Sequence, residues 1–180
     1  VGENKPIIVS GTITDASGRL LSGQTVDAFY NSIRHVDLLA VGLNCALGAK
    51  QIRPYIEVLS KIADTNVLVY PNAGLPNEFG EYDQSPEEMA SYLSEFSDSA
   101  FVNIIGGCCG TKPDHIAEFV KIAKEKDPRK IPSIENMTRL SGLESLTIRS
   151  ETNFINIGER TNVTGSLRFK RLIKEDKFDE

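Results

Sequence analysis

Short apolar runs alternate along the chain with segments whose hydrophobic residues recur every three or four positions. The runs cover residues 6–13, 38–44, 66–70 and 101–105, and apolar side chains dominate each of them. Runs of this kind are typical of strands buried on both faces of a parallel sheet. Each run is followed by a pattern typical of an amphipathic helix. The chain therefore predicts four consecutive βα units and an α/β fold.

The pattern also predicts where individual residues of the helical segments lie. Thr111 is the expected N-terminal cap of this helix. Its inward face is expected to carry four apolar residues, Ile116, Phe119, Val120 and Ala123. His35 and His115 fall on helices away from the strand ends, and both are predicted to be surface residues.

Two architectures suit four βα units. One is a small doubly wound sheet, and the other is half of a (β/α)8 barrel, which as a whole takes ~250 residues. Both folds place their sites at the C-terminal ends of the strands. The distinctive polar residues of this chain follow its predicted strands at those ends.

The pattern changes after the fourth helix. Residues 127–153 contain two prolines and no clear period, which indicates a linker with some local structure. Residues 154–162 predict a new strand that ends in a polar cluster, and residues 166–176 predict a basic helix. We therefore expect a first domain over residues 1–126 and the start of a second domain over residues 154–180.

Composition limits the kinds of partner and compartment that fit this chain. Its 180 residues carry a net charge of −5, which argues against nucleic acid or a membrane surface as the main partner. No apolar run approaches the ~18 residues of a membrane span. The first residues do not resemble a signal peptide and include no initiator Met, so we expect a piece of a longer protein. An odd cysteine count with two adjacent residues suits a reducing cytoplasm better than a disulfide framework.

All three cysteines follow predicted strands. Cys45 ends the second run, and Cys108 and Cys109 follow the fourth within the sequence GGCCGT. Zinc favours tetrahedral thiolate coordination, and a catalytic zinc site supplies three protein ligands and leaves the fourth position open. Adjacent residues on a regular strand point to opposite faces, so a shared metal requires a break in the strand. Glycines 106, 107 and 110 are expected to permit the backbone angles of that break.

Two simpler interpretations compete with a zinc site. Cysteine often only fills a core, and this is the plainer interpretation of Cys45 taken alone. A redox dithiol is the other, but the C-x-x-C spacing is absent. A zinc site would add specific chemistry, because a thiol with a pKa near ~8.5 is deprotonated when it binds zinc. Three protein thiolates outweigh the zinc charge, so the site suits attack by sulfur better than generation of hydroxide.

Several segments resemble known sequences. GLNCALGA at residues 42–49 and GGCCGT at residues 106–111 resemble the zinc motifs of the homocysteine S-methyltransferase family. The stretch at residues 9–25 resembles the one that precedes those motifs in the cobalamin-dependent methionine synthases. NIGERTNVTGS, at residues 156–166, is similar to the start of the pterin-binding module of the same enzymes.

The resemblance implies a fold and a metal site. The fold would be the second half of a (β/α)8 homocysteine barrel, followed by a linker and the opening strand and helix of a second barrel. Zinc would be held by Cys45, Cys108 and Cys109, with Asn72 as a further ligand when substrate is absent. By itself, Asn72 beside Pro71 is equally consistent with a turn.

The resemblance also implies a reaction. Methylcobalamin would donate a methyl group to homocysteine to give methionine, and methyltetrahydrofolate would remethylate cobalamin, which a module absent from this chain would bind. Glu159 and Asn162 match positions that contact the pterin, although on their own they would be an ordinary loop residue and a helix cap. Thr12 and Asp15 are expected to line the homocysteine pocket. The alternative is a non-catalytic zinc-binding or thiol-sensing structural module.

Overall fold

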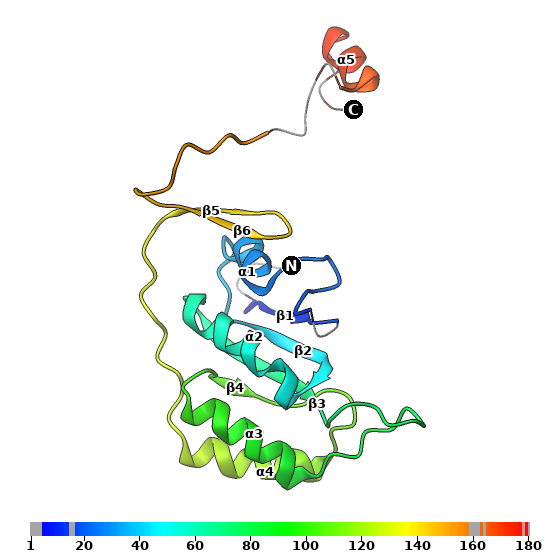
Figure 1. Ribbon diagram of the computed structural model, residues 1–180, viewed down its shortest axis with the longest axis vertical. Helices are drawn as coiled ribbons and strands as arrows, with labels where there is room; N and C mark the ends of the chain where they lie inside the picture. The colour runs from blue at the N-terminus through cyan, green and yellow to red at the C-terminus, as the bar shows by residue number, and fades with distance from the viewer. Residues whose placement is uncertain (1–4, 15–16, 159–162, 164, 178, 180) are drawn as a thin grey trace. The chain divides into compact units, whose positions relative to one another are not determined.

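The computed structural model describes residues 5–14, 17–158, 163, 165–177 and 179, except for the side chains of residues 45–47. It divides into two compact units, Val1–Ile148 and Arg149–Glu180, and each is described here by itself. The elements in chain order (Figure 1) are β1 (Ile8–Thr12), α1 (Val26–Ile33), β2 (Ala40–Gly48), α2 (Ala49–Ile62), β3 (Asn66–Asn72), α3 (Pro86–Asp98), β4 (Ile104–Ile105), α4 (Pro113–Glu125), β5 (Thr138–Ser141), β6 (Ser145–Ile148) and α5 (Leu167–Lys174).

The first unit is built on a four-stranded sheet with the order β1-β2-β3-β4. All three neighbouring pairs are parallel, and each strand pairs with the next one along the chain. In the register, Val9 lies opposite Val41, and Val41 lies opposite Val67. The α/β fold with alternating strands and helices that the sequence predicts is therefore confirmed.

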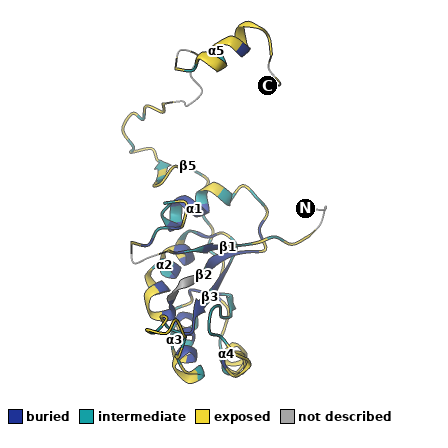
Figure 2. Cartoon of the chain, turned by 90° about the vertical axis from the view of Figure 1, so that its right-hand side faces the viewer, coloured by how far each residue is buried: buried dark blue, intermediate teal, exposed yellow. Residues whose placement is uncertain are grey.

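The core lies between one face of this sheet and the helices. Alternate strand residues face opposite sides of a sheet, and the set that includes Val41, Leu43, Val67 and Val69 is completely buried. These valines and leucine form one cluster with the apolar stripes of α1, α2 and α3. In Figure 2 the buried residues accordingly gather on the strands and on one side of the helices. On β1, the residues that face the other side of the sheet are more exposed, and Ile8 is 47% exposed.

Strand β4 is shorter than the run that predicts it. Phe101 and Val102 are buried, but only Ile104 and Ile105 pair with β3 in the ladder. Just before them, the side-chain oxygen of Asn103 accepts a hydrogen bond from the N–H of Val67, at 3.0 Å. The Asn103 side chain thereby takes the place of a strand carbonyl, while its own N–H donates to the carbonyl of Val67 at 2.8 Å.

Helix α4 is rotated relative to the predicted inward face. Of the four predicted apolar positions only Phe119 is buried, whereas Ile116 and Val120 are 43% and 46% exposed and Ala123 is exposed too. The inward stripe is His115, Phe119 and Ile122, at i, i+4 and i+7. The prediction of a surface His115 is therefore wrong, because it followed apolar residues alone and this imidazole is only 4% exposed. His35 is exposed, as predicted.

The predicted cap of α4 is also wrong. The N-cap residue is Lys112, and the helix starts with Pro113. The hydroxyl oxygen of Thr111 is buried and has no hydrogen-bond partner in the described part of the chain. Proline at the first helical position sets the start one residue later than the Thr111 prediction, because its fixed φ suits the first turn.

The segment expected to be a linker contains a β-hairpin. β5 and β6 pair antiparallel around residues 142–144 and pack against α1. The N–H of Thr25 donates to the carbonyl of Leu143 at 2.9 Å, which ties the hairpin turn to the N-cap residue of α1. Hydrophobic patterning does not predict this hairpin, because its strands are short and largely polar.

The described residues of the second unit contain one helix, α5. Ser166 caps α5, and its hydroxyl accepts the N–H of Phe169 at 3.2 Å, so the helix predicted in this region is present. The strand predicted over residues 154–162 is not seen in its described part, residues 154–158. Phe154 is 95% exposed, which is consistent with a segment that has no strand to pair with.

Among the described residues, no helix is long and apolar enough to cross a membrane.

Arg129 fastens the chain after α4 to the end of α2. Its side chain is 4% exposed, and its guanidinium donates to the carbonyls of Ser60, Ala63 and Thr65 at 2.6–3.0 Å. Burial lowers the pKa of this guanidinium. The last carbonyls of a helix lack partners within the helix, and a positive charge there also complements the helix dipole. Arg129 therefore completes the C-terminal end of α2.

Arg129→Met should lower the free energy of unfolding by roughly 2–4 kcal/mol, because buried carbonyls lose a charged donor while the apolar stem is kept. Urea denaturation measures this change. Lys130→Met, at the exposed neighbouring position, is the matched control and should stay within about 0.5 kcal/mol of the original chain. Equal effects of the two substitutions would contradict the role of Arg129.

Candidate metal centre

The two adjacent cysteines lie beside the end of β3. After β4, the N–H of Gly106 donates to the carbonyl of Val69 at 3.0 Å, and that of Cys108 donates to Pro71 at 2.8 Å. These bonds continue the parallel ladder beyond the two residues of β4. The cysteines therefore lie at the C-terminal edge of the sheet, where the sequence predicts them.

Asn72, the last residue of β3, holds the backbone of Cys109. Its side chain is only 1% exposed, and its oxygen accepts the N–H of Cys109 at 3.1 Å. The next residue, Ala73, donates its N–H to the carbonyl of Cys109 at 2.9 Å. Both backbone groups of Cys109 are thus bound by the end of β3. Through its side chain, Asn72 therefore fixes the turn that carries Cys108 and Cys109, here called the cysteine turn.

The two sulfur atoms point to the same region. They lie 4.0 Å apart, so no disulfide joins them, and both side chains are half-buried. Two sulfur ligands of one tetrahedral zinc ion, with Zn–S near ~2.3 Å, lie roughly 3.8 Å apart. The separation of Cys108 and Cys109 therefore fits a shared metal.

The three glycines of this turn act differently from the sequence expectation. Only Gly110 has a positive φ, of 76°. A Cβ on Gly106 would lie 2.6 Å from the ring of Tyr70, and one on Gly107 would lie 2.1 Å from the hydroxyl of Thr111. Gly106 and Gly107 are therefore required because neighbouring side chains approach the backbone closely, and not because of their backbone angles.

The backbone of Cys45 lies in an irregular part of β2. Asn44 pairs with Tyr70 and Gly48 pairs with Asn72, so four steps along β2 match two along β3. Residues 45–47 form the bulge between these pairs, beside the end of β3 that holds Cys109. Bulges are common next to sites because they re-aim side chains. The side chain of Cys45 is outside the described part, and among the described side chains no three His, Cys, Asp or Glu residues could hold a metal ion.

Thr12 belongs to a small polar group on the neighbouring strand ends. Ser10 donates its hydroxyl to the side-chain oxygen of Asn44 at 2.6 Å, and the amide nitrogen of Asn44 donates to the hydroxyl of Thr12 at 3.3 Å. Asn44 is not among the predicted site residues, although a polar residue directly before Cys45 at a predicted strand end is a usable signal. Asp15 lies outside the described residues, as do Glu159 and Asn162 of the second unit.

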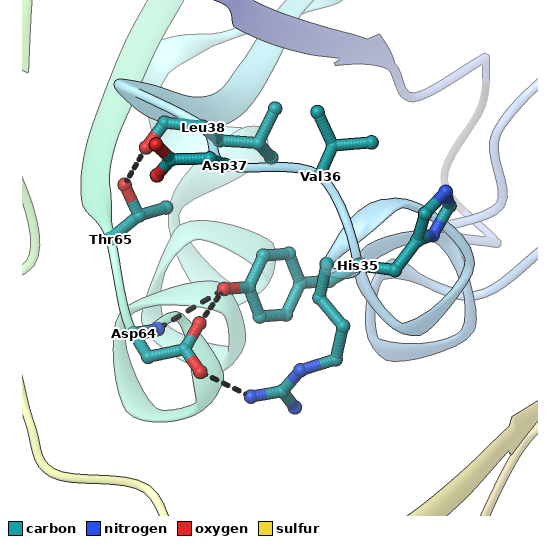
Figure 3. Close-up of a pocket in the computed structure, with 8 residues that line it drawn as sticks. His35, Val36, Asp37, Leu38, Asp64 and Thr65 are labelled. Carbon is teal, nitrogen blue, oxygen red and sulfur yellow. Dashed lines mark hydrogen bonds and ion pairs between the residues drawn. The ribbon is translucent and has the colours of Figure 1, made fainter.

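The opposite edge of the sheet has a polar pocket of about 350 Å³ (Figure 3). It lies before β2 and β3, where Asp64 accepts hydrogen bonds from the hydroxyl of Tyr30 and the guanidinium of Arg34. Burial alone raises the pKa of Asp64, but these two bonds outweigh it and bring the pKa below its ordinary value. Tyr30, Arg34 and Asp64 in this pocket already bind one another, so they stabilise the fold. The pocket is therefore a weaker candidate site than the C-terminal edge of the sheet that carries Cys108 and Cys109, here called the cysteine edge.

Ionisation of Tyr30, which binds Asp64, should lower the stability of the chain measurably at alkaline pH. Burial, and then the bond to Asp64, raise the pKa of Tyr30 to about 12, against ~10 in an unfolded chain. The stabilisation is therefore complete below the unfolded value and is lost as the pH rises through the folded one. Between pH 10 and 12 the original chain should lose about 1–3 kcal/mol more than Tyr30→Phe in urea denaturation. Tyr92→Phe, on α3, is the control and should follow the original chain.

Gly110→Ala should destabilise the chain more than any other glycine substitution in a comparison of three. Gly142→Ala is the control, because it has no positive φ and its Cβ would meet only one atom, at 3.9 Å, so about 0.5 kcal/mol or less is expected. Gly80→Ala has a φ of +77° but open space, and should cost about 1–2 kcal/mol. Gly110→Ala adds a 2.2 Å approach to Tyr82, and should cost roughly 2–4 kcal/mol. A Gly110→Ala effect no larger than that of Gly80→Ala in urea denaturation would refute the packing argument.

Comparison with protein families bears on this edge of the sheet. A family model described as homocysteine S-methyltransferase matches residues 2–123. The match includes all four parallel strands and all three cysteines.

Proposed function

The chain belongs to the homocysteine S-methyltransferase family, and we propose that it carries the zinc-binding part of an enzyme that methylates the thiol of homocysteine. Membership of the family makes the protein part of a methyltransferase. The zinc ion and the source of the methyl group are our proposals. The observation that carries the zinc proposal is the 4.0 Å separation of the sulfur atoms of Cys108 and Cys109.

Cys45, Cys108 and Cys109 are the proposed ligands. Two of them have sulfur atoms at a spacing that suits zinc, and the bulge that contains Cys45 lies beside Asn72, which binds the backbone of Cys109. The donor set is soft and carries three negative charges when ionised, which favours zinc over calcium or magnesium. When bound, zinc would supply a Lewis acid that favours the thiolate form of an incoming thiol.

The residues of this chain have distinct roles in the proposal. Asn72 fixes the backbone of Cys109 and so aims its sulfur toward that of Cys108. The same amide is proposed as a further ligand when substrate is absent. Thr12 and Asp15 are proposed to line the homocysteine pocket, and Thr12 is held by Asn44, directly before Cys45.

The sheet order supports a barrel. A doubly wound sheet reverses its strand order at a switch point, where its ligand binds, whereas here each strand pairs with the next one along the chain. A (β/α)8 barrel has this sequential order throughout. We therefore propose that β1–β4 form the second half of such a barrel.

The proposed methyl donor is methylcobalamin, with methyltetrahydrofolate as the source of the next methyl group. This would make the chain part of a cobalamin-dependent methionine synthase in the cytoplasm. The support is the resemblance of residues 156–166 to a pterin-binding module, in which Glu159 and Asn162 would contact the folate. Cobalamin would be bound by another module of the same polypeptide.

The rival function is a closed, structural zinc site. Such a site has four protein ligands, whereas a catalytic site leaves one position for a substrate or water. The half-buried state of Cys108 and Cys109 favours the open site, because a thiol must reach the metal.

Zinc content and zinc-edge X-ray absorption test the proposal. Cys45→Ala, Cys108→Ala and Cys109→Ala should each lower zinc affinity by at least about tenfold, because each removes one of three thiolates. The exposed His35→Ala is the control and should keep its zinc. With millimolar L-homocysteine, the number of sulfur neighbours should rise from three to four. Zinc retained by all three cysteine variants would remove the metal assignment, and a sulfur count unchanged by homocysteine would favour the structural site.

A further inference from the structure

The buried imidazole of His115 is bound on both nitrogens by backbone groups. Lys112 donates its N–H to Nδ1 at 3.2 Å, so the ring proton lies on Nε2, which donates to the carbonyl of Gln84 at 2.9 Å. His115 therefore joins two separate segments. One is the start of α4, and the other is the loop over residues 73–85, between β3 and α3.

A chain of hydrogen bonds leads from this imidazole to Cys109. Gln84, which accepts from His115, donates its own N–H to the carbonyl of Ala73 at 3.2 Å. Ala73 in turn donates its N–H to the carbonyl of Cys109 at 2.9 Å. Two residues, Gln84 and Ala73, therefore connect the imidazole to the backbone of the second cysteine.

Packing at the same place makes the loop a close fit on the cysteine turn. A Cβ on Gly110 would lie 2.2 Å from the Cβ of Tyr82 and 3.2 Å from that of Ala73. Tyr82 and Ala73 thus lie directly over the residue that follows Cys109. The loop closes on itself as well, since Asn77 accepts the N–H groups of Phe79 and Glu81 through its side-chain oxygen.

We propose that His115 is a positioning residue for the metal centre, which holds the loop over residues 73–85 against the cysteine turn and so fixes the backbone of Cys109. Its role as a positioning residue for metal rests on the proposed function, whereas the hold on the loop does not. The bond from Lys112 serves the helix cap, as the reciprocal half of a capping box does. The bond to Gln84 holds the loop over residues 73–85 against the cysteine turn.

Two substitutions separate these bonds. Asparagine places its oxygen near the position of Nδ1, so His115→Asn keeps an acceptor for Lys112 but cannot reach Gln84. Glutamine places its amide nitrogen near the position of Nε2, so His115→Gln keeps a donor for Gln84 and gives up the acceptor. A residue that serves only the cap is better replaced by Asn, and one that holds the loop is better replaced by Gln.

Hydrogen exchange of the zinc-free chain, followed by mass spectrometry, measures the hold on the loop. In His115→Asn the amides of Ala73 and Cys109 should exchange about five- to thirtyfold faster, as expected for a lost buried hydrogen bond. In His115→Gln they should stay within about threefold of the original chain. His35→Gln, at the exposed histidine, is the control, and residues 40–44 of β2 should be unchanged in every variant.

Three results would overturn the proposal: unchanged exchange in His115→Asn, equal damage in both variants, or a rise that extends through β2. The metal is tested separately with zinc alone. His115→Asn should lose zinc to a chelator at least about fivefold faster than His115→Gln, because the Cys109 backbone is no longer held. If the original chain binds no zinc, the proposed function fails while the exchange experiment still decides whether His115 holds the loop.

Discussion

The bonds between the end of β3 and Cys109 are the constraint on which the cysteine edge depends. A regular strand would point Cys108 and Cys109 to opposite faces. Here the N–H of Cys108 still follows the ladder to Pro71, but that of Cys109 goes to the side chain of Asn72. Successive N–H groups of a regular strand point to opposite sides, whereas here both point to the end of β3, so the backbone leaves the ladder at Cys109. The sulfur atoms can then lie 4.0 Å apart.

The two edges of the sheet show a division between stability and chemistry. At the edge before β2 and β3, Tyr30, Arg34 and Asp64 bind one another, and Arg129 fills carbonyls at the end of α2. These groups reinforce the fold because their donors bind acceptors within the protein. At the other edge, backbone and amide groups do the holding, and the two thiols are left half-buried. Neighbouring groups therefore fix the backbone of Cys109.

The sequence predicted the sheet well because apolar runs and helical periods report burial directly. Those signals located β1, β2, β3 and the helices, and they placed Cys108 and Cys109 at a strand end. They failed where a polar residue does the work of an apolar or backbone group. His115 occupies an inward position of α4, and Asn103 replaces a strand carbonyl before β4. Neither role can be read from hydrophobicity, because each depends on a partner brought close only by the fold.

The family-level function and the finer proposals rest on different parts of the chain. The family match spans residues 2–123 and therefore covers the cysteines, Asn72, His115 and the loop over residues 73–85. In the proposed function, activation of a thiol would use these groups and a metal, whatever molecule supplies the methyl group. The proposed cobalamin and folate steps depend instead on residues 156–166 and on a module outside this chain. The sulfur chemistry can therefore be tested on this chain by zinc and homocysteine alone, and the identity of the methyl donor is a separate question that its outcome leaves open.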